Sequence, residues 1–368
     1  MGLCGQELPR SLHHPLVLSL SKDAHKPKIK GEEPLPVASH RHPRPMDRTG
    51  YSRTMIRPDL LLVAPMPHAI VETLAGHFTI HDLWNAADKD ALLAEIGPAI
   101  RGIASNPVAP PLDAALFDRL PRLEIVSNYA VGYDNIAMAE AARRGIVVTN
   151  TPGVLDAEVA DFTLGLTLAT IREIPQADRF VRRGQWRGGA YPLSSSLQGR
   201  RAGILGLGNI GKAVTRRLEA CDVPVAYSGR HRQDGVPYPY YPDAVSLAEA
   251  CDLLIVIVPG GDGTRHLVND AVLAALGPKG VLINVARGSV VDEAALIAAL
   301  QNGTIQAAGL DVFAHEPHVP EALIALENTV LLPHIGSGSR ETRAAMGQLM
   351  IDNLVNWFTE GKALTPVG

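Results

Sequence analysis

Short apolar runs alternate with helical patterns along the chain from Pro58 onward. The runs in the first half are four or five residues long, the length of a buried strand, and apolar residues recur at helical spacing between them. Strands that alternate with helices are typical of a parallel sheet built from βαβ units. This half of the chain therefore predicts one small doubly wound α/β unit. The candidate strands are residues 60–64, 100–104, 123–127 and 146–149, and two of the candidate helices are 69–74 and 138–144.

A second series of strands and helices follows a long helix and a polar segment. The pattern predicts one helix over residues 154–172 and then a glycine-rich segment at residues 184–199, which we call the arm. Beyond the arm, six strands separated by helices give the number expected of a dinucleotide-binding domain. A final helix at residues 340–360 is expected to return to the first unit. The six strands are predicted at residues 202–205, 223–227, 253–258, 281–285, 307–312 and 330–332.

Length, charge and cysteine usage narrow the class of protein. A chain of 368 residues exceeds the roughly 250–300 residues at which a single core stops growing, which favours two domains. The formal charge of −4 and the lack of a long apolar run argue against a nucleic-acid partner and against a membrane span. Three scattered cysteines outside any zinc spacing predict thiols in a reducing, cytoplasmic protein. Residues 1–54 carry no periodic apolar pattern and are expected to be disordered, with the functional chain beginning near Met55.

A glycine motif opens the second series. Gly206-Leu207-Gly208-Asn209-Ile210-Gly211 is a GxGxxG, which is weak evidence alone in a chain with 34 glycines. Here it follows an apolar strand and begins an amphipathic helix. Gly206 would allow the tight turn, Gly208 the approach of a pyrophosphate, and Gly211 close packing of helix on strand. The motif in this context predicts dinucleotide binding.

The end of the next strand bears on which dinucleotide is bound. Enzymes that use NAD place an acidic residue there to hold the ribose hydroxyls. This chain has Ser228 instead, followed by Arg230 and Arg232. A hydroxyl and two guanidinium groups suit the 2′-phosphate of NADP, and no carboxylate stands there to repel it. The alternative is that the two arginines lie in a solvated loop.

Three chemically active residues follow strands of the second series. Arg287 comes just after the strand at 281–285, Glu316 after the strand at 307–312, and His334 after the strand at 330–332. Open α/β sheets bind ligands at the carboxyl ends of their strands. A histidine for proton transfer, a carboxylate to hold it charged and an arginine for an anionic substrate form a complete set for carbonyl reduction. The alternatives are structural roles: Arg287 could cap a strand end with Glu316 as its surface partner, and His334 could be an ordinary histidine in a loop.

Taken together, these segments resemble the D-isomer-specific 2-hydroxyacid dehydrogenases. The resemblance covers about residues 55–368 and is closest to the NADP-using glyoxylate/hydroxypyruvate reductases and their hydroxyphenylpyruvate-reducing relatives. It implies two Rossmann-like domains with the active site in the cleft between them. The blocks that carry it are Leu205-Gly206-Leu207-Gly208-Asn209-Ile210-Gly211, Asn284-Val285-Ala286-Arg287-Gly288, Gly309-Leu310-Asp311-Val312-Phe313, Glu316-Pro317 and Pro333-His334-Ile335-Gly336-Ser337.

The resemblance implies a role for each site residue. His334 would be the general acid, with Glu316 as its partner favouring the imidazolium form. Arg287 would hold the substrate carboxylate, together with the backbone N–H groups of Val131 and Gly132 in the loop at residues 128–135. The residues that would contact NADP are Gly206, Leu207, Gly208, Asn209, Ile210, Gly211, Ser228, Arg230, Arg232, Val258, Pro259, Thr264, Val285, Ala286, Asp311, His334 and Gly336.

The sequence pattern predicts a division of the chain, and the resemblance implies a homodimer. The predicted parts are a disordered extension at 1–54, the first part of the substrate-binding domain at 55–150, the dinucleotide-binding domain at 151–333, and a segment at 334–368 that returns to the substrate-binding domain. In related dimers the arm crosses to the partner subunit. Trp186 and Tyr191 in the arm of this chain would then lie near the partner's active site, although packing alone also explains both residues.

Some features depart from the family's pattern or favour another type of protein. Pro259-Gly260-Gly261-Asp262-Gly263-Thr264 is richer in glycine than the usual Pro-Leu-Thr-Pro-Glu-Thr, which puts cofactor contacts there in doubt. The cluster His315-Glu316-Pro317-His318 lacks the spacing of a zinc site, so no metal is expected. Two alternatives remain: a corepressor of the same fold that senses the dinucleotide, and an NAD-linked D-lactate or phosphoglycerate dehydrogenase. Turnover and cofactor preference would discriminate among the three.

Overall fold

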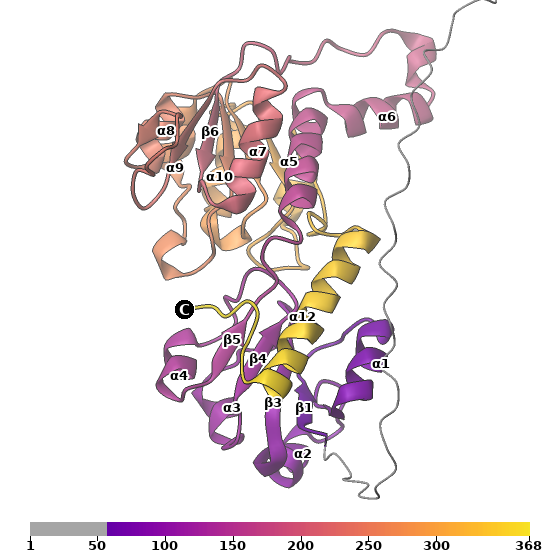
Figure 1. Cartoon of the computed structure of the whole chain (residues 1–368). Coiled ribbons are helices and arrows are strands. Elements are labelled where there is room, and N and C mark those ends of the chain that lie inside the picture. The colour runs from indigo at the N-terminus through magenta and orange to yellow at the C-terminus, as the bar shows by residue number, and fades with distance from the viewer. Residues whose placement is uncertain (1–56) are drawn as a thin grey trace, which may run out of the picture. The chain divides into compact units, whose positions relative to one another are not determined.

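The computed structural model describes residues 57–368 as two parallel β-sheets with their helices (Figure 1). The α/β class with two doubly wound sheets is therefore confirmed. The expectations for residues 1–54 and for Cys4 lie outside the described residues. The domain boundaries at residues 55, 151 and 334 remain predictions.

The first sheet has five strands in the order β2-β1-β3-β4-β5, and all neighbouring pairs are parallel. The hydrophobic pattern does not predict β2, because Thr79, His81 and Asp82 leave it without an apolar run. This edge strand pairs with β1, and a 2.7 Å contact joins His81 to Asp59. The strands are β1 (Asp59–Leu62), β2 (Thr79–Asp82), β3 (Ile100–Ser105), β4 (Ile125–Asn128) and β5 (Val147–Thr149).

Helices cover the first sheet, and one of them comes from the end of the chain. The helix α12 (Arg340–Glu360) begins where the Ser339 hydroxyl accepts the Thr342 N–H, and ends before Gly361. Its residues Met346, Met350 and Leu354 join the core that contains the side chains of β1. The Ser127 hydroxyl donates to the Met350 carbonyl at 3.1 Å, and Figure 1 shows α12 crossing this sheet. The other elements here are α1 (His68–His77), α2 (Lys89–Ile96), η1 (Gly97–Ala99), α3 (Ala114–Asp118) and α4 (Met138–Arg143).

The second sheet has seven strands in the order β12-β11-β10-β9-β6-β7-β8. The chain builds outward from β6 on one side and from β9 on the other, so the strand order reverses between these two neighbours. Open α/β sheets bind ligands at such a switch point. The two-residue strand β8 is not predicted, because it is too short to show a pattern. The strands are β6 (Ala202–Leu205), β7 (Val225–Ser228), β8 (Tyr240–Tyr241), β9 (Leu253–Val256), β10 (Val281–Asn284), β11 (Ala307–Leu310) and β12 (Thr329–Leu331).

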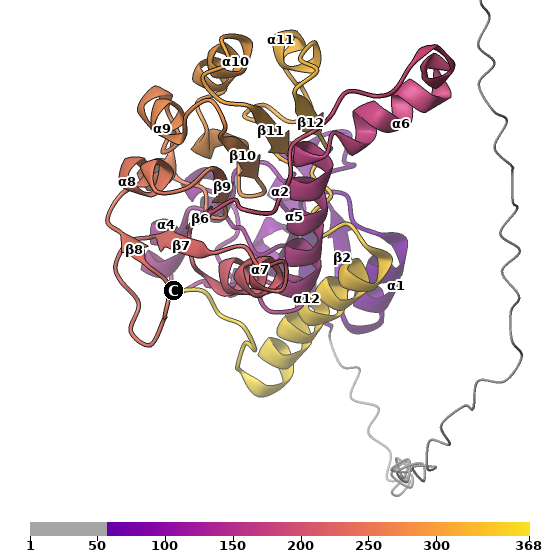
Figure 2. The ribbon, with the colours of Figure 1, turned by 90° about the horizontal axis from the view of Figure 1, so that it is seen from above.

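Two cores enclose the second sheet. Apolar side chains of α5 and α7 pack on one face, and those of α8, α9 and α10 pack on the other (Figure 2). Because both faces are covered, every residue of β9 and β10 is buried, and all of these residues are apolar except Asn284 at the end of β10. The helices are α5 (Asp156–Ile171), α7 (Asn209–Glu219), α8 (Ala244–Glu249), α9 (Asp270–Leu276), α10 (Glu293–Gln301) and α11 (Glu321–Ile324), with the short turns η3 (Asp262–Thr264) and η4 (Gly288–Val290).

A further helix, α6 (Ile174–Arg182), and the turn η2 (Gln185–Gly188) join α5 to β6 through the arm. The pattern does not predict α6, which has no buried residue. Figure 2 shows α6 standing clear of the sheets. Within the arm, Trp186 is 66% exposed, whereas Tyr191 donates to Glu173 at 2.8 Å and packs edge-on against Phe180.

Two cysteines lie among the described residues. Cys251 is buried under the second sheet, and burial raises the pKa of its thiol to about 12. Cys221 is partly buried, and both residues are free cysteines. In residues 57–368, none of the helices has the length and apolarity that crossing a bilayer requires.

Candidate active site

The loop from β6 to α7 has the form needed to hold a dinucleotide. Gly206 adopts a φ of 103°, which favours glycine. A Cβ at Gly211 would lie 2.3 Å from the Gly206 carbonyl oxygen, so the helix approaches the strand too closely for a side chain. Among residues 57–368, a Cβ at Gly208 would meet nothing within 4 Å, and no side chain caps the start of α7. The first N–H groups of α7 therefore face open space at the positive end of the helix dipole, which fits a pyrophosphate.

The end of β7 differs from the sequence-based expectation at one position. Arg230 and Arg232 are exposed, as a phosphate-binding pair requires. Ser228, however, is only 3% exposed, and its carbonyl accepts the Gly206 N–H at 2.9 Å. The serine is buried because it is the last residue of the strand and packs beside the glycine loop. Recognition of a 2′-phosphate would consequently depend on the two arginines.

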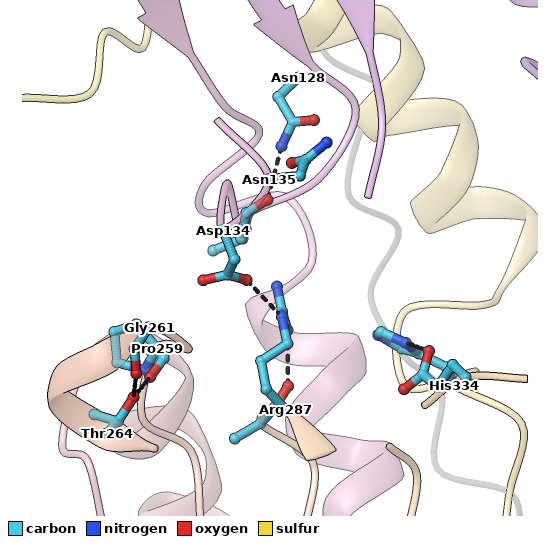
Figure 3. Close-up of polar contacts among 12 residues, drawn as sticks. Asn128, Asp134, Asn135, Pro259, Gly261, Thr264, Arg287 and His334 are labelled. Atoms are coloured by element: carbon cyan, nitrogen blue, oxygen red, sulfur yellow. Dashed lines mark hydrogen bonds and ion pairs between the residues drawn. The ribbon is translucent and has the colours of Figure 1, made fainter. Parts of the chain in front are cut away.

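The segment after β9 forms a loop with internal hydrogen bonds, and it lies beside the glycine loop that joins β6 to α7. A Cβ at Gly206 would lie 2.9 Å from the Val258 side chain, so these two residues are neighbours. The Thr264 hydroxyl donates to the carbonyls of Pro259 and Gly261 at 2.7 and 3.1 Å (Figure 3). Thr264 thus holds the shape of this loop, in addition to any contact with the cofactor.

The imidazole of His334 is joined to a carboxylate. Its Nδ1 lies 2.7 Å from Glu316 Oε2, and the other oxygen of Glu316 accepts the Phe313 N–H at 3.1 Å. His334 has a φ of 54°, a left-handed conformation that is uncommon for residues other than glycine. Burial alone would raise the pKa of Glu316, but the His334 hydrogen bond, the Phe313 N–H and the charges of His334 and Arg287 together lower it. Glu316 is therefore held in its ionised form beside the imidazole.

Asp311 holds the turn that carries His334. Its two carboxylate oxygens accept the N–H groups of Ile335 and Gly336, each at 2.8 Å, and the residue is 2% exposed. Burial raises the pKa of Asp311, while these two N–H groups and the His334 charge oppose that rise. A cofactor contact of Asp311 and Gly336 stays a prediction, and in this structure the Asp311 carboxylate accepts the Gly336 N–H. Their hydrogen bonds fix the backbone on which His334 depends.

A small apolar cavity flanks the His334–Glu316 pair. Its volume is about 220 Å³, and the side chains that line it are mainly aliphatic or aromatic. These walls remove part of Glu316 from water, although its side chain stays 35% exposed, and this partial burial opposes its ionisation. The lining residues are Phe313, Glu316, Pro317, Val319, Leu331, Leu332, Pro333 and His334.

Arg287 points from the end of β10 toward the loop after β4 (Figure 3). Its Nε donates to Asp134 Oδ2 at 2.8 Å, and its Nη1 donates to the Ala286 carbonyl at 2.7 Å. The Nη2 atom lies against Gly132, where a Cβ would be 1.5 Å away. Within residues 57–368, Nη2 donates to no acceptor. Arg287 and the carboxylate-binding loop predicted from the sequence are therefore brought together.

Hydrogen bonds fix the direction of the peptide groups in this loop. The Ala130 carbonyl accepts the Thr151 N–H at 3.0 Å, and the Val131 carbonyl accepts the Asn150 side chain at 2.8 Å. In a trans peptide the N–H points away from the carbonyl of the same unit. The N–H groups of Val131 and Gly132 are thus turned away from Thr151 and Asn150. No acceptor in the described part of the chain binds either N–H.

Comparison with known proteins identifies the family. A family model described as D-isomer specific 2-hydroxyacid dehydrogenase, NAD binding domain, matches residues 164–336. The glyoxylate/hydroxypyruvate reductase A of Arabidopsis thaliana is 45% identical over 308 residues, which are 84% of this chain and 98% of that protein. The hydroxyphenylpyruvate reductase of Plectranthus scutellarioides is 44% identical over the same shares. The chain belongs to the D-isomer specific 2-hydroxyacid dehydrogenase family.

A solved structure extends this result to the whole described fold. The NADPH-dependent glyoxylate/hydroxypyruvate reductase of Sinorhizobium meliloti, in complex with NADP and malonate, is 52% identical with a TM-score of 0.81. The match covers 85% of this chain and 97% of that one. The dehydrogenase described here is an oxidoreductase that uses a nicotinamide dinucleotide, and the resemblance seen in its sequence is confirmed.

Two residues of this dehydrogenase's site were not found from the sequence. Asp134 belongs to the loop that the sequence analysis singled out, but its partner Arg287 is 153 positions away. Asn150 follows β5 and binds the loop from the neighbouring strand. A polar residue just beyond a buried strand is the only local signal for either one. The partner of such a residue depends on the order of strands in the sheet, which the sequence pattern does not provide.

Proposed function

We propose that this dehydrogenase reduces a small 2-keto acid, such as glyoxylate, hydroxypyruvate or an aryl-pyruvate, to the D-2-hydroxy acid with NADPH. One observation carries the proposal. The Nη2 of Arg287 lies against Gly132, and no acceptor within residues 57–368 binds that nitrogen or the N–H groups of Val131 and Gly132. A carboxylate accepts hydrogen bonds from donors of this kind. The charge of Arg287 also reaches Glu316, the partner of His334.

The proposed chemistry assigns one task to each side chain. Arg287 and the loop hold the carboxylate of the keto acid and orient its carbonyl group. When bound, the reduced nicotinamide supplies a hydride to carbon 2 of the substrate. The imidazolium of His334 donates its Nδ1–H in a hydrogen bond to Glu316, 2.7 Å away, and transfers its Nε2 proton to the carbonyl oxygen. The ionised Glu316 stabilises that imidazolium until the proton has left.

The preference for NADPH rests on Arg230 and Arg232. Both are exposed beyond β7, and no carboxylate follows that strand until Asp234. The related Sinorhizobium meliloti reductase is described as NADPH-dependent, which supports the same preference here. Removing a charge-assisted hydrogen bond costs roughly 1.5–3 kcal/mol, so Arg230→Ala should reduce the preference for NADPH over NADH by about 10-fold or more. Comparison of kcat/KM for the two cofactors measures it, and an unaltered ratio would count against the assignment.

A panel of 2-keto acids tests the function itself. Purified protein is mixed with NADPH or NADH and each acid, and the loss of absorbance at about 340 nm is followed. We expect turnover with glyoxylate or hydroxypyruvate, faster with NADPH, and a product of D configuration. A dinucleotide-sensing corepressor would bind NADPH and consume almost none of it. An NAD-linked D-lactate or phosphoglycerate dehydrogenase would prefer NADH with its own substrate.

We also propose that the dehydrogenase is a homodimer that joins through α6 and the arm. Four large apolar side chains of this region are exposed, and such grouping is typical of an interface. Val181→Ser combined with Trp186→Ser should shift the mass in solution from dimer to monomer, as light scattering would report. A wild-type monomer would contradict the proposal. The exposed side chains are Ile174 at 53%, Val181 at 53%, Trp186 at 66% and Leu193 at 100%.

A further inference from the structure

One ion pair links the loop of the first sheet to the second sheet. Asp134 follows β4, and Arg287 follows β10, yet Asp134 Oδ2 accepts the Arg287 Nε–H at 2.8 Å (Figure 3). Their side chains are 37% and 30% exposed. The other guanidinium nitrogens have different surroundings: Nη1 binds the Ala286 carbonyl, and Nη2 rests against Gly132. Each nitrogen of Arg287 therefore has a defined place.

The Asp134–Arg287 ion pair fits where it does because two neighbouring residues are glycines, which have no side chain. A Cβ at Gly132 would lie 1.5 Å from Nη2 of Arg287. A Cβ at Gly260 would lie 2.9 Å from Arg287 Cγ and 2.9 Å from Asp134 Oδ1. Gly260 stands where the family's usual pattern has leucine. The unusual glycine content of the loop after β9 thus has a local explanation at this position, because a leucine side chain would collide with the pair.

We propose that Asp134 is a positioning residue that aims Arg287 at the substrate. Its carboxylate binds Nε, so that the guanidinium plane turns Nη2 toward Gly132 and keeps that nitrogen available for the carboxylate of the keto acid. Gly260 is the residue that permits the contact. This inference rests on the proposed function and adds to it the group that orients the anion-binding arginine.

The charge of Asp134 has a second consequence. A carboxylate beside Arg287 repels the carboxylate of a bound keto acid, so Asp134 would weaken substrate binding if charge alone mattered. Its benefit must come from orientation, because an arginine that turns freely loses the geometry that a planar fork provides. An ion pair that is one-third exposed adds little to folding. Loss of Asp134 should therefore affect substrate binding far more than thermal stability.

Variants of Asp134 test this orientation. We expect Asp134→Ala to raise KM for the keto acid and to lower kcat/KM by about 10- to 100-fold, since a misplacement of about 1 Å has effects of that size. Asp134→Asn keeps an oxygen that accepts the Nε–H and removes the repelling charge, so it should recover most of the activity. Asp161→Ala, which breaks a surface ion pair with Arg217, is the matched control and should leave kinetics unchanged.

Binding measurements separate the positioning role from a structural one. The dissociation constant of oxamate, an unreactive mimic of a 2-keto acid, should rise in Asp134→Ala by the same factor as KM. The dissociation constant of NADPH should remain at its wild-type value. Wild-type kcat/KM and oxamate affinity in Asp134→Ala would overturn the inference. A wild-type protein that reduces none of the keto acids would instead overturn the proposed function.

A pair of glycine variants examines the space around the ion pair. Gly260→Ala keeps both charges but places a methyl group 2.9 Å from each partner. It should lower kcat/KM for the keto acid by about 10-fold. Gly263→Ala lies in the same loop, where a Cβ meets nothing within 4 Å, and should retain wild-type kinetics. Equal kinetics in the two variants would contradict the role given to Gly260.

Discussion

The two sheets contribute to the site in different ways. Charged side chains lie at the carboxyl ends of β10–β12, and each forms a hydrogen bond with a neighbour. Arg287 binds Asp134, His334 binds Glu316, and Asp311 binds the turn after His334. At the carboxyl end of β4 the donors belong to the backbone. There the carbonyl groups of Ala130 and Val131 accept hydrogen bonds, and the N–H groups of Val131 and Gly132 bind no acceptor in the described part of the chain. In the proposed function, the second sheet would supply proton transfer and charge, and the first sheet would supply backbone donors.

The largest effect should come from removing the proton donor of the second sheet. His334→Ala should lower kcat by about 10²–10⁴-fold, the usual contribution of general acid catalysis. Because alanine disfavours the φ of 54° found here, His334→Asn serves as a second variant, since asparagine tolerates that conformation. Fluorescence titration should give NADPH affinities close to wild type for both variants. Turnover that survived in both would leave His334 without its proposed role.

A smaller effect is expected from disturbing the backbone donors of the first sheet. In Gly132→Ala, a methyl group 1.5 Å from Nη2 must displace Arg287, which should lower kcat/KM about 10- to 100-fold. Gly76→Ala, where a Cβ meets nothing within 4 Å, is the control and should match wild-type kinetics. If the two alanine variants behaved alike in steady-state assays, the close approach of Arg287 to the loop would be wrong.

The smallest effect concerns the charge beside His334. Reduction needs the imidazolium, which the negative charge of Glu316 stabilises, so Glu316→Gln should lower kcat/KM for the keto acid by about 10-fold at most. The lowered pKa of Glu316 also acts on stability. A carboxyl with a lowered folded-state pKa stabilises the protein above its unfolded pKa, and this contribution is lost as pH falls through the folded pKa. Melting temperatures of wild type and variant should therefore converge in acid. A variant with the same activity as wild type would contradict the role given to the charge of Glu316.

The contrast between the sheets also explains what the sequence could reveal. Arg287, Glu316 and His334 follow apolar strands and carry recognisable chemistry, so their place at one edge follows from the βα pattern. The fully buried strands β9 and β10 and the long helix α12 were predicted nearly to their ends. The glycine motif likewise lies between β6 and α7, as its context indicated.

Other features depend on contacts that no local pattern encodes. Strand β2 and helix α6 lack a buried apolar run, so the hydrophobic pattern passes over them. Ser228 has a chemically suitable side chain, but its position at the end of β7 buries it. Asp311 was assigned to the cofactor, yet both of its oxygens bind the turn at 335–336. The surroundings of these residues depend on contacts between segments that are distant in the sequence.

A crystal structure of the protein with NADPH and oxamate would show whether Arg287 and His334 act on the same bound molecule. We expect the oxamate carboxylate to bind the Gly132 N–H and Arg287 Nη2, with its carbonyl oxygen about 3 Å from Nε2 of His334. An oxamate bound away from the loop, or an imidazole of His334 directed away from the carbonyl oxygen, would contradict it.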